Sequence, residues 1–326
     1  SKDGISKLES FSVFAERYLK GVFDVIHFLP FCPYSSDNGF SVIDYMRLAD
    51  GLGSWDDLKR LGNNYTLMYD FVCNHVSSVG KWATAYKSGD SKYKDYFIEK
   101  DACDDYSKVV RPRTSTLFSE VETKFGKREL WTTFGSDQWD LNYKNPEVLL
   151  SILDVLLSYI ERGGRWIRLD AIGFLWKESG STCLNLPKTH AMVRLFRSVL
   201  DQVCPSVRLI TETNVPHKDN IAYFGNGENE SHMVYQFALP VLTLYSFFRQ
   251  SAVELSKWAK SLSLPSEKTS FFNFLASHDG VGLNPARGIL PENEILNMVE
   301  HYRHSAGALV SYKDQPDGSK APYELN

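Results

Sequence analysis

The sequence of 326 residues lacks the long apolar run that a membrane-spanning helix needs. No hydrophobic stretch approaches the roughly 20 residues of such a helix, and the segment from Ser1 to Gly4 does not have the composition of a signal peptide. Lys and Arg total 36 against 40 Asp and Glu, with both signs interspersed and a net charge of −4. Because no basic stripe is present, we expect neither nucleic acid nor a membrane surface as a partner.

Cysteine is scarce, and the metal-binding motifs that use cysteine or histidine are missing. The five cysteines form no CxxC pair and are scattered through the chain, at Cys32, Cys73, Cys103, Cys183 and Cys204. An odd and scattered set predicts reduced thiols rather than a disulfide framework, and therefore a cytoplasmic location. Because neither an HxH nor an HExxH pattern occurs, we expect no metal ion and no other cofactor.

The sequence does contain a repeated alternation of apolar strands with amphipathic helices. Hydrophobic residues make up 43% of the chain and charged residues 23%, which suits a large core. Strands are expected at 23–29, 65–72, within 163–174, and at 207–213, 233–237 and 271–275, and helices near 10–19, 54–61, 146–162, 188–203, 253–262 and 292–303. Polar residues follow nearly every strand, whereas a doubly wound sheet would gather them at one switch point. The pattern therefore predicts an α/β fold of the (β/α)8 barrel type.

Two of the expected helices have explicit N-terminal signals. Ser54, with Asp57 three residues later, has the spacing of a capping box, in which each side chain binds the backbone N–H of the other residue. Asn145, Pro146 and Glu147 combine a capping side chain, a proline suited to the first turn and an acid near the positive end of the helix dipole. These signals predict that the two helices begin directly after Ser54 and Asn145.

The segment from Val76 to Lys144 interrupts the alternation. It is rich in Lys, Asp, Ser and Tyr, has no sustained periodicity and is too long for a simple loop. We interpret it as a small inserted subdomain. The chain then divides into a first part of the barrel (1–75), the inserted subdomain (76–144) and the remainder of the barrel (145–326).

One stretch, GGRWIRLDAIGF from Gly163 to Phe174, joins a helix stop to a buried strand that ends in charged residues. Side chains alternate between the two faces of a strand, so Arg168 and Asp170 point the same way. A neighbouring guanidinium favours the ionised form of a carboxylate, which a carboxylate nucleophile requires. A structural ion pair inside the core fits the same residues, so this stretch alone does not decide between the two interpretations.

Other acidic, amide and imidazole side chains occur where further strands end. They are Asp37, Asp70, Asn74, His75, Glu212, His278 and Asp279. The C-terminal ends of all strands in a barrel meet at one mouth, so we expect these side chains to converge there. Any one of them alone suits the capping of a loop amide, and it is their joint occurrence that favours a catalytic site.

Four of these segments resemble the signature regions of the α-amylase superfamily: DFVCNH (70–75), RLDA (168–171), TETNVPH (211–217) and SHD (277–279). Four others resemble the sucrose phosphorylase branch of that superfamily: SSDNGFSVIDY (35–45), RPR (111–113), WTTFGSDQWDLNY (131–143) and DQPDGSKAPYELN (314–326). Within this branch, residues 211–217 and 273–291 are most similar to the glucosylglycerate phosphorylases. The resemblance extends over essentially the whole chain.

The resemblance implies a (β/α)8 barrel with the small subdomain inserted after the third barrel strand. It also implies a retaining α-glucoside phosphorylase that transfers glucose to phosphate from glucosylglycerate, with sucrose or sucrose 6′-phosphate as alternative donors. Asp170 would be the nucleophile, Glu212 the general acid and base, and Asp279 the residue that braces the transition state through sugar hydroxyls. Such a double displacement needs two carboxyl groups roughly 5 Å apart, one ionised and one protonated. Burial of Glu212 on an apolar strand would raise its pKa towards neutrality.

The resemblance also implies a set of substrate contacts. Imidazoles would bind hydroxyls of the donor glucose, a carboxylate would bind its far edge, and an aromatic ring and an amide would lie near the nucleophile. The residues in question are Asp37, His75, Phe134, Gln138, Arg168 and His278. Inorganic phosphate would be the co-substrate.

Phosphate beside two carboxylates needs a compensating cation, for which Arg111 or Arg113 is suited. Either arginine could instead form an ion pair that ties the insertion to the barrel. The segment from Asp314 to Lys320 resembles a mobile loop of the acceptor site, although its composition also suits a plain surface loop.

The expected strands are fewer than a closed barrel requires. We find six or seven instead of eight, and the family places one strand before the first expected helix and another, with a β domain, beyond Asn326. We therefore expect a chain truncated at both ends, whose open seam leaves strand edges unpaired. This supports a second hypothesis, a non-catalytic sugar-binding fragment or a homo-oligomer that covers the seam. Plain hydrolysis of a glucoside is a third.

Overall fold

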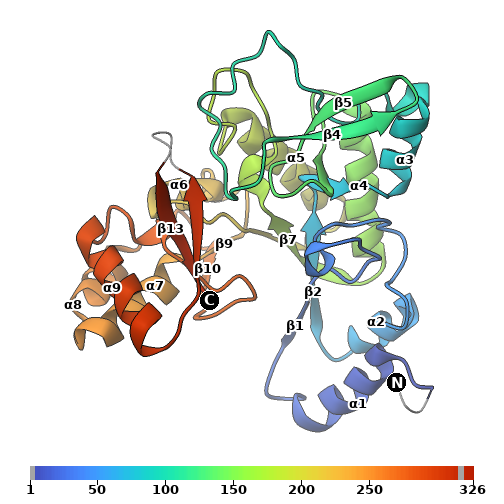
Figure 1. Cartoon of the computed structure of the whole chain (residues 1–326). Helices are drawn as coiled ribbons and strands as arrows, with labels where there is room; N and C mark the ends of the chain where they lie inside the picture. Colours follow the sequence, from blue (N-terminus) through green and yellow to red (C-terminus); the bar gives the residue numbers. More distant parts are fainter. Residues whose placement is uncertain (1–3, 315–318) are drawn as a thin grey trace.

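The centre of the molecule is a six-stranded sheet, seen in a computed structural model that describes residues 4–314 and 319–326 (Figure 1). Its strands are β1 (Val25–Phe28), β2 (Thr66–Val72), β7 (Gly164–Asp170), β8 (Arg208–Thr211), β9 (Met233–Tyr235) and β10 (Ser270–Phe272). Every neighbouring pair is parallel, and the strands follow one another across the sheet in chain order.

Parallel strands in chain order are the arrangement of a (β/α)8 barrel, because a doubly wound sheet reverses its order at a switch point. The described residues provide six strands, and β1 and β10 form the two edges of the sheet. The predicted fold class, an α/β barrel that is incomplete in this chain, is therefore confirmed. The predicted strand positions also agree with the structure: β7 lies within the predicted stretch 163–174, and the other five strands are shorter than predicted by one to three residues.

Nine α-helices occur in the described part of the chain. They are α1 (Lys7–Tyr18), α2 (Trp55–Leu61), α3 (Lys81–Ser88), α4 (Pro146–Glu161), α5 (Pro187–Val203), α6 (His217–Ile221), α7 (Ala238–Arg249), α8 (Val253–Ser261) and α9 (Glu292–Ser305). Both predicted helix starts are confirmed, since Ser54 and Asp57 form the capping box of α2 and the Asn145 side chain caps α4. Within the described residues, none of the helices combines the length and the apolar character needed to cross a bilayer.

The main core lies between the sheet and the helices that follow its strands. Leu169 of β7 and Phe71 of β2 are fully buried together with Ile152 of α4 and Phe196 of α5. The rings of Phe71 and Phe196 meet edge to face, with their centroids 6.2 Å apart. Burial of large apolar side chains on both faces of the strands explains why these strands read as continuous hydrophobic runs in the sequence.

The insertion leaves the sheet at the end of β2 and returns before α4. Its two ends pair as short antiparallel strands, β3 (His75–Ser77) and β6 (Gln138–Asp140), and between them β4 (Phe118–Thr123) and β5 (Gly126–Trp131) form a hairpin. The insertion therefore follows the second strand of the described sheet. The prediction of a third strand counted a family strand that precedes the first helix and is not among the described residues. The division into 1–75, 76–144 and 145–326 stays a prediction.

A buried ammonium group joins the insertion to the sheet. Lys177 is only 6% exposed, and its Nζ lies 2.5 Å from Asp140 Oδ2 and 2.7 Å from Asn74 Oδ1. It also donates to the Phe174 carbonyl oxygen at 2.6 Å. Asp140 in turn accepts bonds from the backbone N–H and the hydroxyl of Thr133. Because a buried charge needs a partner of opposite sign, this cluster holds β6 against the ends of β2 and β7.

The C-terminal part of the chain contains a second core that the sequence analysis did not predict. It is formed by α7, α8 and α9 with a three-stranded antiparallel sheet, and it lies on the left of the molecule in Figure 1. The sheet has the order β11 (Val281–Gly282), β13 (Lys320–Leu325) and β12 (Val310–Asp314). The predicted acceptor loop, from Asp314 to Lys320, connects β12 to β13 and lies mostly outside the described residues.

Replacement of Lys177 by Met should destabilise the fold by about 3–5 kcal/mol, because Asp140 would be left buried without its counter-charge. Chemical denaturation monitored by circular dichroism measures this change. The matched control is Lys188→Met, since the Lys188 ion pair with Glu178 is more than half exposed and contributes less than about 1 kcal/mol. Equal stability of the Lys177 and Lys188 variants would contradict the structural role of the buried ammonium.

Candidate active site

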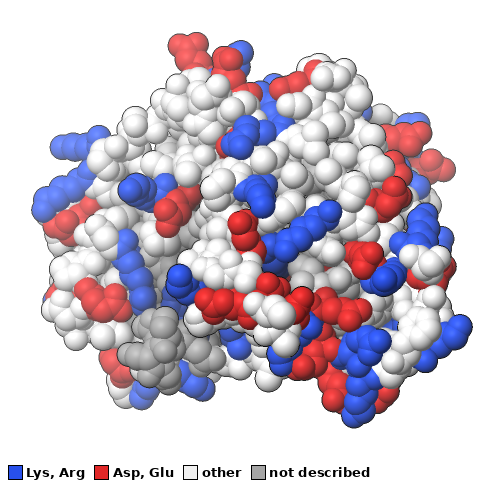
Figure 2. All heavy atoms as spheres, turned by 90° about the horizontal axis from the view of Figure 1, so that it is seen from above, with Lys and Arg blue, Asp and Glu red and all other residues white. Residues whose placement is uncertain are grey.

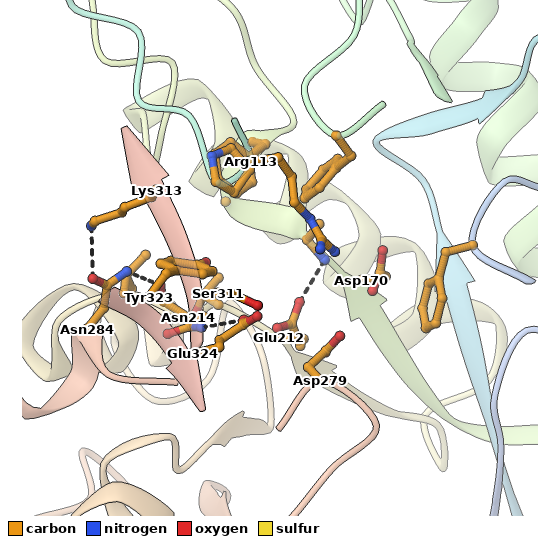
Figure 3. Close-up of a pocket in the computed structure, with 18 of the residues that line it drawn as sticks. Arg113, Asp170, Glu212, Asn214, Asp279, Asn284, Ser311, Lys313, Tyr323 and Glu324 are labelled. Atoms are coloured by element: carbon orange, nitrogen blue, oxygen red, sulfur yellow. Dashed lines mark hydrogen bonds between the residues drawn. The ribbon is translucent and has the colours of Figure 1, made fainter. Parts of the chain in front are cut away.

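A cavity of about 560 Å³ opens at the C-terminal ends of the strands, between the insertion and the β12–β13 hairpin (Figure 3). The structure brings together in its wall all but one of the predicted site residues: Asp37, His75, Arg111, Arg113, Phe134, Gln138, Asp170, Glu212, His278 and Asp279. The remaining one, Arg168, is 2% exposed and contacts the carboxyl groups from below. The expectation that Asp70 and Asn74 also reach the mouth is wrong, because both are buried outside this wall, where Asp70 binds Arg168 and Asn74 binds Lys177. The chemical roles of these residues stay predictions.

The surface around this side of the molecule carries charges of both signs. Figure 2 shows Lys and Arg side chains scattered among Asp and Glu, without a continuous basic area on the visible face. The interspersed charges of the sequence thus remain interspersed after folding. Several acidic side chains also line the cavity itself.

Arg168 is the centre of the charge network beneath the cavity. Its Nη1 donates to Asp70 Oδ1 at 2.5 Å and to Asp170 Oδ1 at 2.6 Å, and its Nη2 lies 3.8 Å from Glu212 Oε2. The parallel register of β2 and β7 sets Asp70 directly beside Arg168. His27 of β1 binds the other oxygen of Asp70 at 2.9 Å. The Arg168 guanidinium therefore forms ion pairs with three carboxyl groups, which come from the ends of three strands.

Because Asp70, Asp170 and Glu212 share the Arg168 guanidinium, their pKa values depend on one another. Burial alone would raise the pKa of Asp70, but Arg168 and His27 hold it below its ordinary value. Burial raises the pKa of Asp170, and the charge of Glu212 adds to this rise while Arg168 opposes it. Burial likewise raises the pKa of Glu212, against the effect of Arg168. Since both pKa values are raised, we expect Asp170 and Glu212 to hold one proton between them.

This finding corrects one prediction from the sequence. Arg168 does contact Asp170, but it does not lower the pKa of Asp170 below the ordinary value, because burial raises this pKa and the charges of Glu212 and Asp70 add to the rise. Strand parity predicts which side chains share a face, yet it does not give the register of the neighbouring strand. The predicted rise of the pKa of Glu212 by burial agrees with the structure.

The backbone immediately after Asp170 is strained and points at Glu212. Ala171 has φ of 48°, in the left-handed region that non-glycine residues rarely occupy, and it precedes a short 3₁₀ turn from Ile172 to Phe174. Its N–H donates to Glu212 Oε2 at 3.0 Å. A conformation of this kind costs about 1–3 kcal/mol and persists only where the surroundings fix it. The strained backbone at Ala171, directly after Asp170, thus orients the Glu212 carboxyl group.

The third predicted acid, Asp279, lies in the cavity wall beyond the end of β10 (Figure 3). His278 Nε2 is 3.3 Å from Asp279 Oδ2, and the His278 ring stacks on Phe40 with centroids 5.1 Å apart and planes 12° apart. Burial lowers the pKa of His278, although Asp279 opposes this effect. The ring stacking and the contact of His278 with Asp279 together fix the direction of both polar groups.

The end of the cavity next to the insertion is lined by a connected polar set. His75 Nε2 lies 3.0 Å from the Phe40 carbonyl oxygen and 3.1 Å from Gln138 Nε2, which also donates to Asp37 Oδ2 at 2.9 Å. The Phe134 ring lies 5.1 Å from the His75 ring, centroid to centroid. Burial lowers the pKa of His75, so this imidazole is neutral at neutral pH. A neutral imidazole, an amide and a carboxylate suit the hydroxyl groups of a sugar.

Arg111 and Arg113 reach the cavity from the loop of the insertion. Arg113 is exposed and lies over Glu212 in Figure 3, whereas Arg111 is half-buried. The charge of Arg113 lowers the pKa of Glu324 on the facing hairpin, so the arginine lies close to that carboxyl group. Contact of either arginine with phosphate stays a prediction.

Sequence reasoning missed the residues that form the opposite wall of the cavity. They come from the loop after β8, the start of the second core and the β12–β13 hairpin, and they are Asn214, Asn284, Ser311, Lys313, Tyr323 and Glu324. Asn214 Nδ2 donates to Glu324 Oε1 at 3.2 Å. Tyr323 and Glu324 stand within a segment already singled out in the sequence, so a signal existed. What it lacked was the antiparallel pairing that turns this segment towards the mouth of the barrel.

The acidic and imidazole side chains of the described residues are not grouped as metal ligands. Over residues 4–314 and 319–326, no group of three or more His, Cys, Asp or Glu side chains is arranged to hold a metal ion. The carboxyl groups next to Arg168 are occupied by its guanidinium. The expectation that no metal or other cofactor is required stays a prediction.

The Glu324 carboxyl group should make stability depend on pH. Burial and the charge of Asp279 raise its pKa from 4.5 to about 7. A group whose pKa is raised on folding destabilises the fold as pH rises from the unfolded pKa to the folded one, here by up to about 3 kcal/mol between pH 4.5 and 7. Glu324→Gln should remove this part of the pH dependence of the unfolding free energy, and the exposed control Glu267→Gln should not. Identical pH profiles for both variants would contradict the burial of a titrating Glu324.

Known proteins similar to this chain share both its sequence and its fold. The family described as "Alpha amylase, catalytic domain" matches residues 16–283. A glucosylglycerate phosphorylase of Escherichia coli (strain K12) is 51% identical over 323 residues, which are 99% of this chain and 58% of the relative. A glucosylglycerate phosphorylase of Spirochaeta thermophila is 49% identical, over 100% of this chain and 55% of the relative. The chain thus spans just over half the length of these curated relatives.

A solved structure supports the fold independently. The crystal structure of sucrose 6F-phosphate phosphorylase from Thermoanaerobacter thermosaccharolyticum superimposes with a TM-score of 0.86, covering 98% of this chain and 67% of that one. At 24% sequence identity this likeness concerns the fold alone. The family match covers well over half of the chain, from the first helix to the residues that follow Asp279. The chain therefore belongs to the α-amylase family.

Proposed function

We propose that this chain carries the catalytic site of a retaining α-glucoside phosphorylase, which transfers glucose from glucosylglycerate to inorganic phosphate and yields α-D-glucose 1-phosphate. The observation that supports this most is the contact of Asp170 and Glu212 with one guanidinium, in a cavity that also contains Asp279. Two carboxyl groups in this relation can flank one glycosidic bond. The glucosylglycerate phosphorylases that resemble this chain do so along almost all of its length.

The first displacement uses the proton that the two acids share. When Glu212 holds it, Asp170 is anionic and next to Arg168, which is the form that attacks the anomeric carbon. The bond from Asp170 to that carbon forms as the bond to the glycerate oxygen breaks, and Glu212 gives its proton to the departing oxygen. The product is a covalent glucosyl-enzyme, and Glu212 is left ionised.

The second displacement reverses these roles with phosphate as the nucleophile. Glu212 takes the proton of the attacking phosphate hydroxyl, an oxygen of phosphate bonds to the anomeric carbon, and Asp170 leaves as a carboxylate. Two inversions at one carbon retain the α configuration. The negative charge of phosphate is compensated by Arg113 or Arg111 at the mouth of the cavity.

We propose glucosylglycerate as the glucosyl donor because the chain is similar to glucosylglycerate phosphorylases. Sucrose and sucrose 6′-phosphate remain the alternative donors. Sucrose phosphorylases are more distant relatives, for example one of Streptococcus mutans that is 29% identical. A hydrolase is distinguished by turnover of the donor that is the same with and without phosphate. We further propose a cytoplasmic protein whose partners are a small sugar and phosphate, with no cofactor.

A second candidate is a non-catalytic fragment that self-associates. The observation in its favour is the pair of parallel edge strands, β1 and β10, which do not pair with each other in the described part of the chain. Such edges are templates for association. Release of glucose 1-phosphate by this chain would rule the candidate out.

Replacement of each acid should have a different consequence. We expect Asp170→Asn to abolish turnover of glucosylglycerate and of α-glucosyl fluoride alike, because no covalent intermediate can form. Glu212→Gln should lose about 10²–10⁴-fold with glucosylglycerate but much less with the fluoride, whose leaving group needs no proton. Release of glucose 1-phosphate and of fluoride is measured with and without phosphate.

The assay uses the 326-residue chain and the same chain extended by the C-terminal segment of the Escherichia coli relative. Asp154→Asn, exposed on α4, is the control for a loss of charge. Undiminished turnover by the Asp170 variant would refute the assignment of the nucleophile. Turnover that does not depend on phosphate would establish a hydrolase instead.

A further inference from the structure

The cavity wall formed by the β12–β13 hairpin contains a lysine that the proposed mechanism does not use. Lys313, near the end of β12, lines the cavity with Asn284 and Tyr323, on the side away from Asp170 (Figure 3). The other cationic side chains of the wall, Arg111 and Arg113, come from the insertion. Lys313 is thus the only lysine or arginine that the second core contributes to the described wall.

The Lys313 side chain is half-buried and held by neutral groups. Its Nζ donates to Asn284 Oδ1 at 2.9 Å and lies 5.6 Å from the centroid of the Tyr323 ring. No carboxylate among the described residues forms an ion pair with it. Burial and the charge of Arg287 lower its pKa, and Glu292 acts in the opposite direction. A partly desolvated ammonium without an anionic partner gains free energy when an anion enters the same cavity.

The rest of the cavity is unfavourable for an anionic ligand. Four acidic residues line it together, Asp170, Glu212, Asp279 and Glu324, and Asp170 and Glu212 keep a negative charge when they share one proton. Asp37 adds a further carboxyl group at the glucose end. A neutral acceptor such as glycerol meets no electrostatic barrier here, whereas a carboxylate needs compensation. In the proposed mechanism Arg113 or Arg111 compensates the phosphate, and a cation on the opposite wall is placed to compensate the carboxylate of the acceptor.

We propose that Lys313 determines acceptor specificity, by favouring acceptors that carry a carboxylate over neutral polyols of the same size. The inference rests on the proposed function, since it concerns the acceptor of that reaction. Asn284 fixes the ammonium through its side-chain oxygen, and the Tyr323 ring covers one side of it. At the effective dielectric constant of a partly buried site, one unit charge across the acceptor space changes affinity by about tenfold or more.

The test measures equilibrium binding, so it does not depend on turnover. Saturation-transfer NMR titrations give the dissociation constants of D-glycerate, glycerol and inorganic phosphate for the wild-type chain and for Lys313→Gln. The exposed Lys260→Gln on α8 is the matched control. We expect Lys313→Gln to weaken glycerate about tenfold, to leave glycerol unchanged and to affect phosphate less than glycerate. Lys313→Arg, which keeps the charge, should largely preserve the affinity for glycerate.

Three results would overturn the inference: unchanged glycerate affinity in Lys313→Gln, an equal loss for glycerate and glycerol, or a loss confined to phosphate. The last would make Lys313 a phosphate ligand. The proposed function fails by a different result: the wild-type chain with the C-terminal extension would release no glucose 1-phosphate. The two failures are distinguishable because binding and turnover are different measurements.

Discussion

The buried guanidinium of Arg168 is the interaction on which the site depends. Three carboxyl groups from neighbouring strands meet it, and the parallel register of β2 and β7 fixes this arrangement. Asp70 is the acid whose pKa stays low, whereas the pKa values of Asp170 and Glu212 are raised. These two acids share the positive charge of Arg168 that Asp70 does not neutralise. The proposed retaining mechanism needs one ionised and one protonated carboxyl group, and unequal sharing of a single cation favours that state.

The fold was predictable where local physics decides it. The capping box of Ser54 and Asp57 and the Asn145 cap fixed two helix starts, and hydrophobic runs located the six barrel strands. The sequence analysis missed α7 because the helix is apolar on most of its circumference, being packed inside the second core, and so shows no amphipathic period. Its Pro240 stands in the first turn, where proline is tolerated, but in the sequence it reads as a break. The antiparallel sheet of β11, β12 and β13 depends on pairing between distant segments and has no local signal.

The sequence predicted which residues form the candidate site better than it predicted their pKa values. Most of the strand-end residues converge on one cavity, because the C-terminal ends of parallel barrel strands meet at one mouth, whereas Asp70 and Asn74 bind Arg168 and Lys177 outside its wall. The balance among Asp70, Asp170 and Glu212 was not predictable, since it depends on the register between strands and on burial. Asn284, Lys313 and Glu324 escaped notice for a similar reason: they reach the cavity only through the packing of the second core against the barrel mouth.

The central claim is that Asp170 and Glu212 hold a single proton at neutral pH, and that Glu212 carries it because Arg168 lies 2.6 Å from Asp170 but 3.8 Å from Glu212. Difference infrared spectroscopy of the carboxyl region measures this directly, in a Glu324→Gln background that removes the other acid of raised pKa in the cavity. The account predicts one protonated buried carboxyl group at neutral pH that disappears in Glu212→Gln. Absence of any protonated carboxyl band, or a band that survives Glu212→Gln, would contradict it.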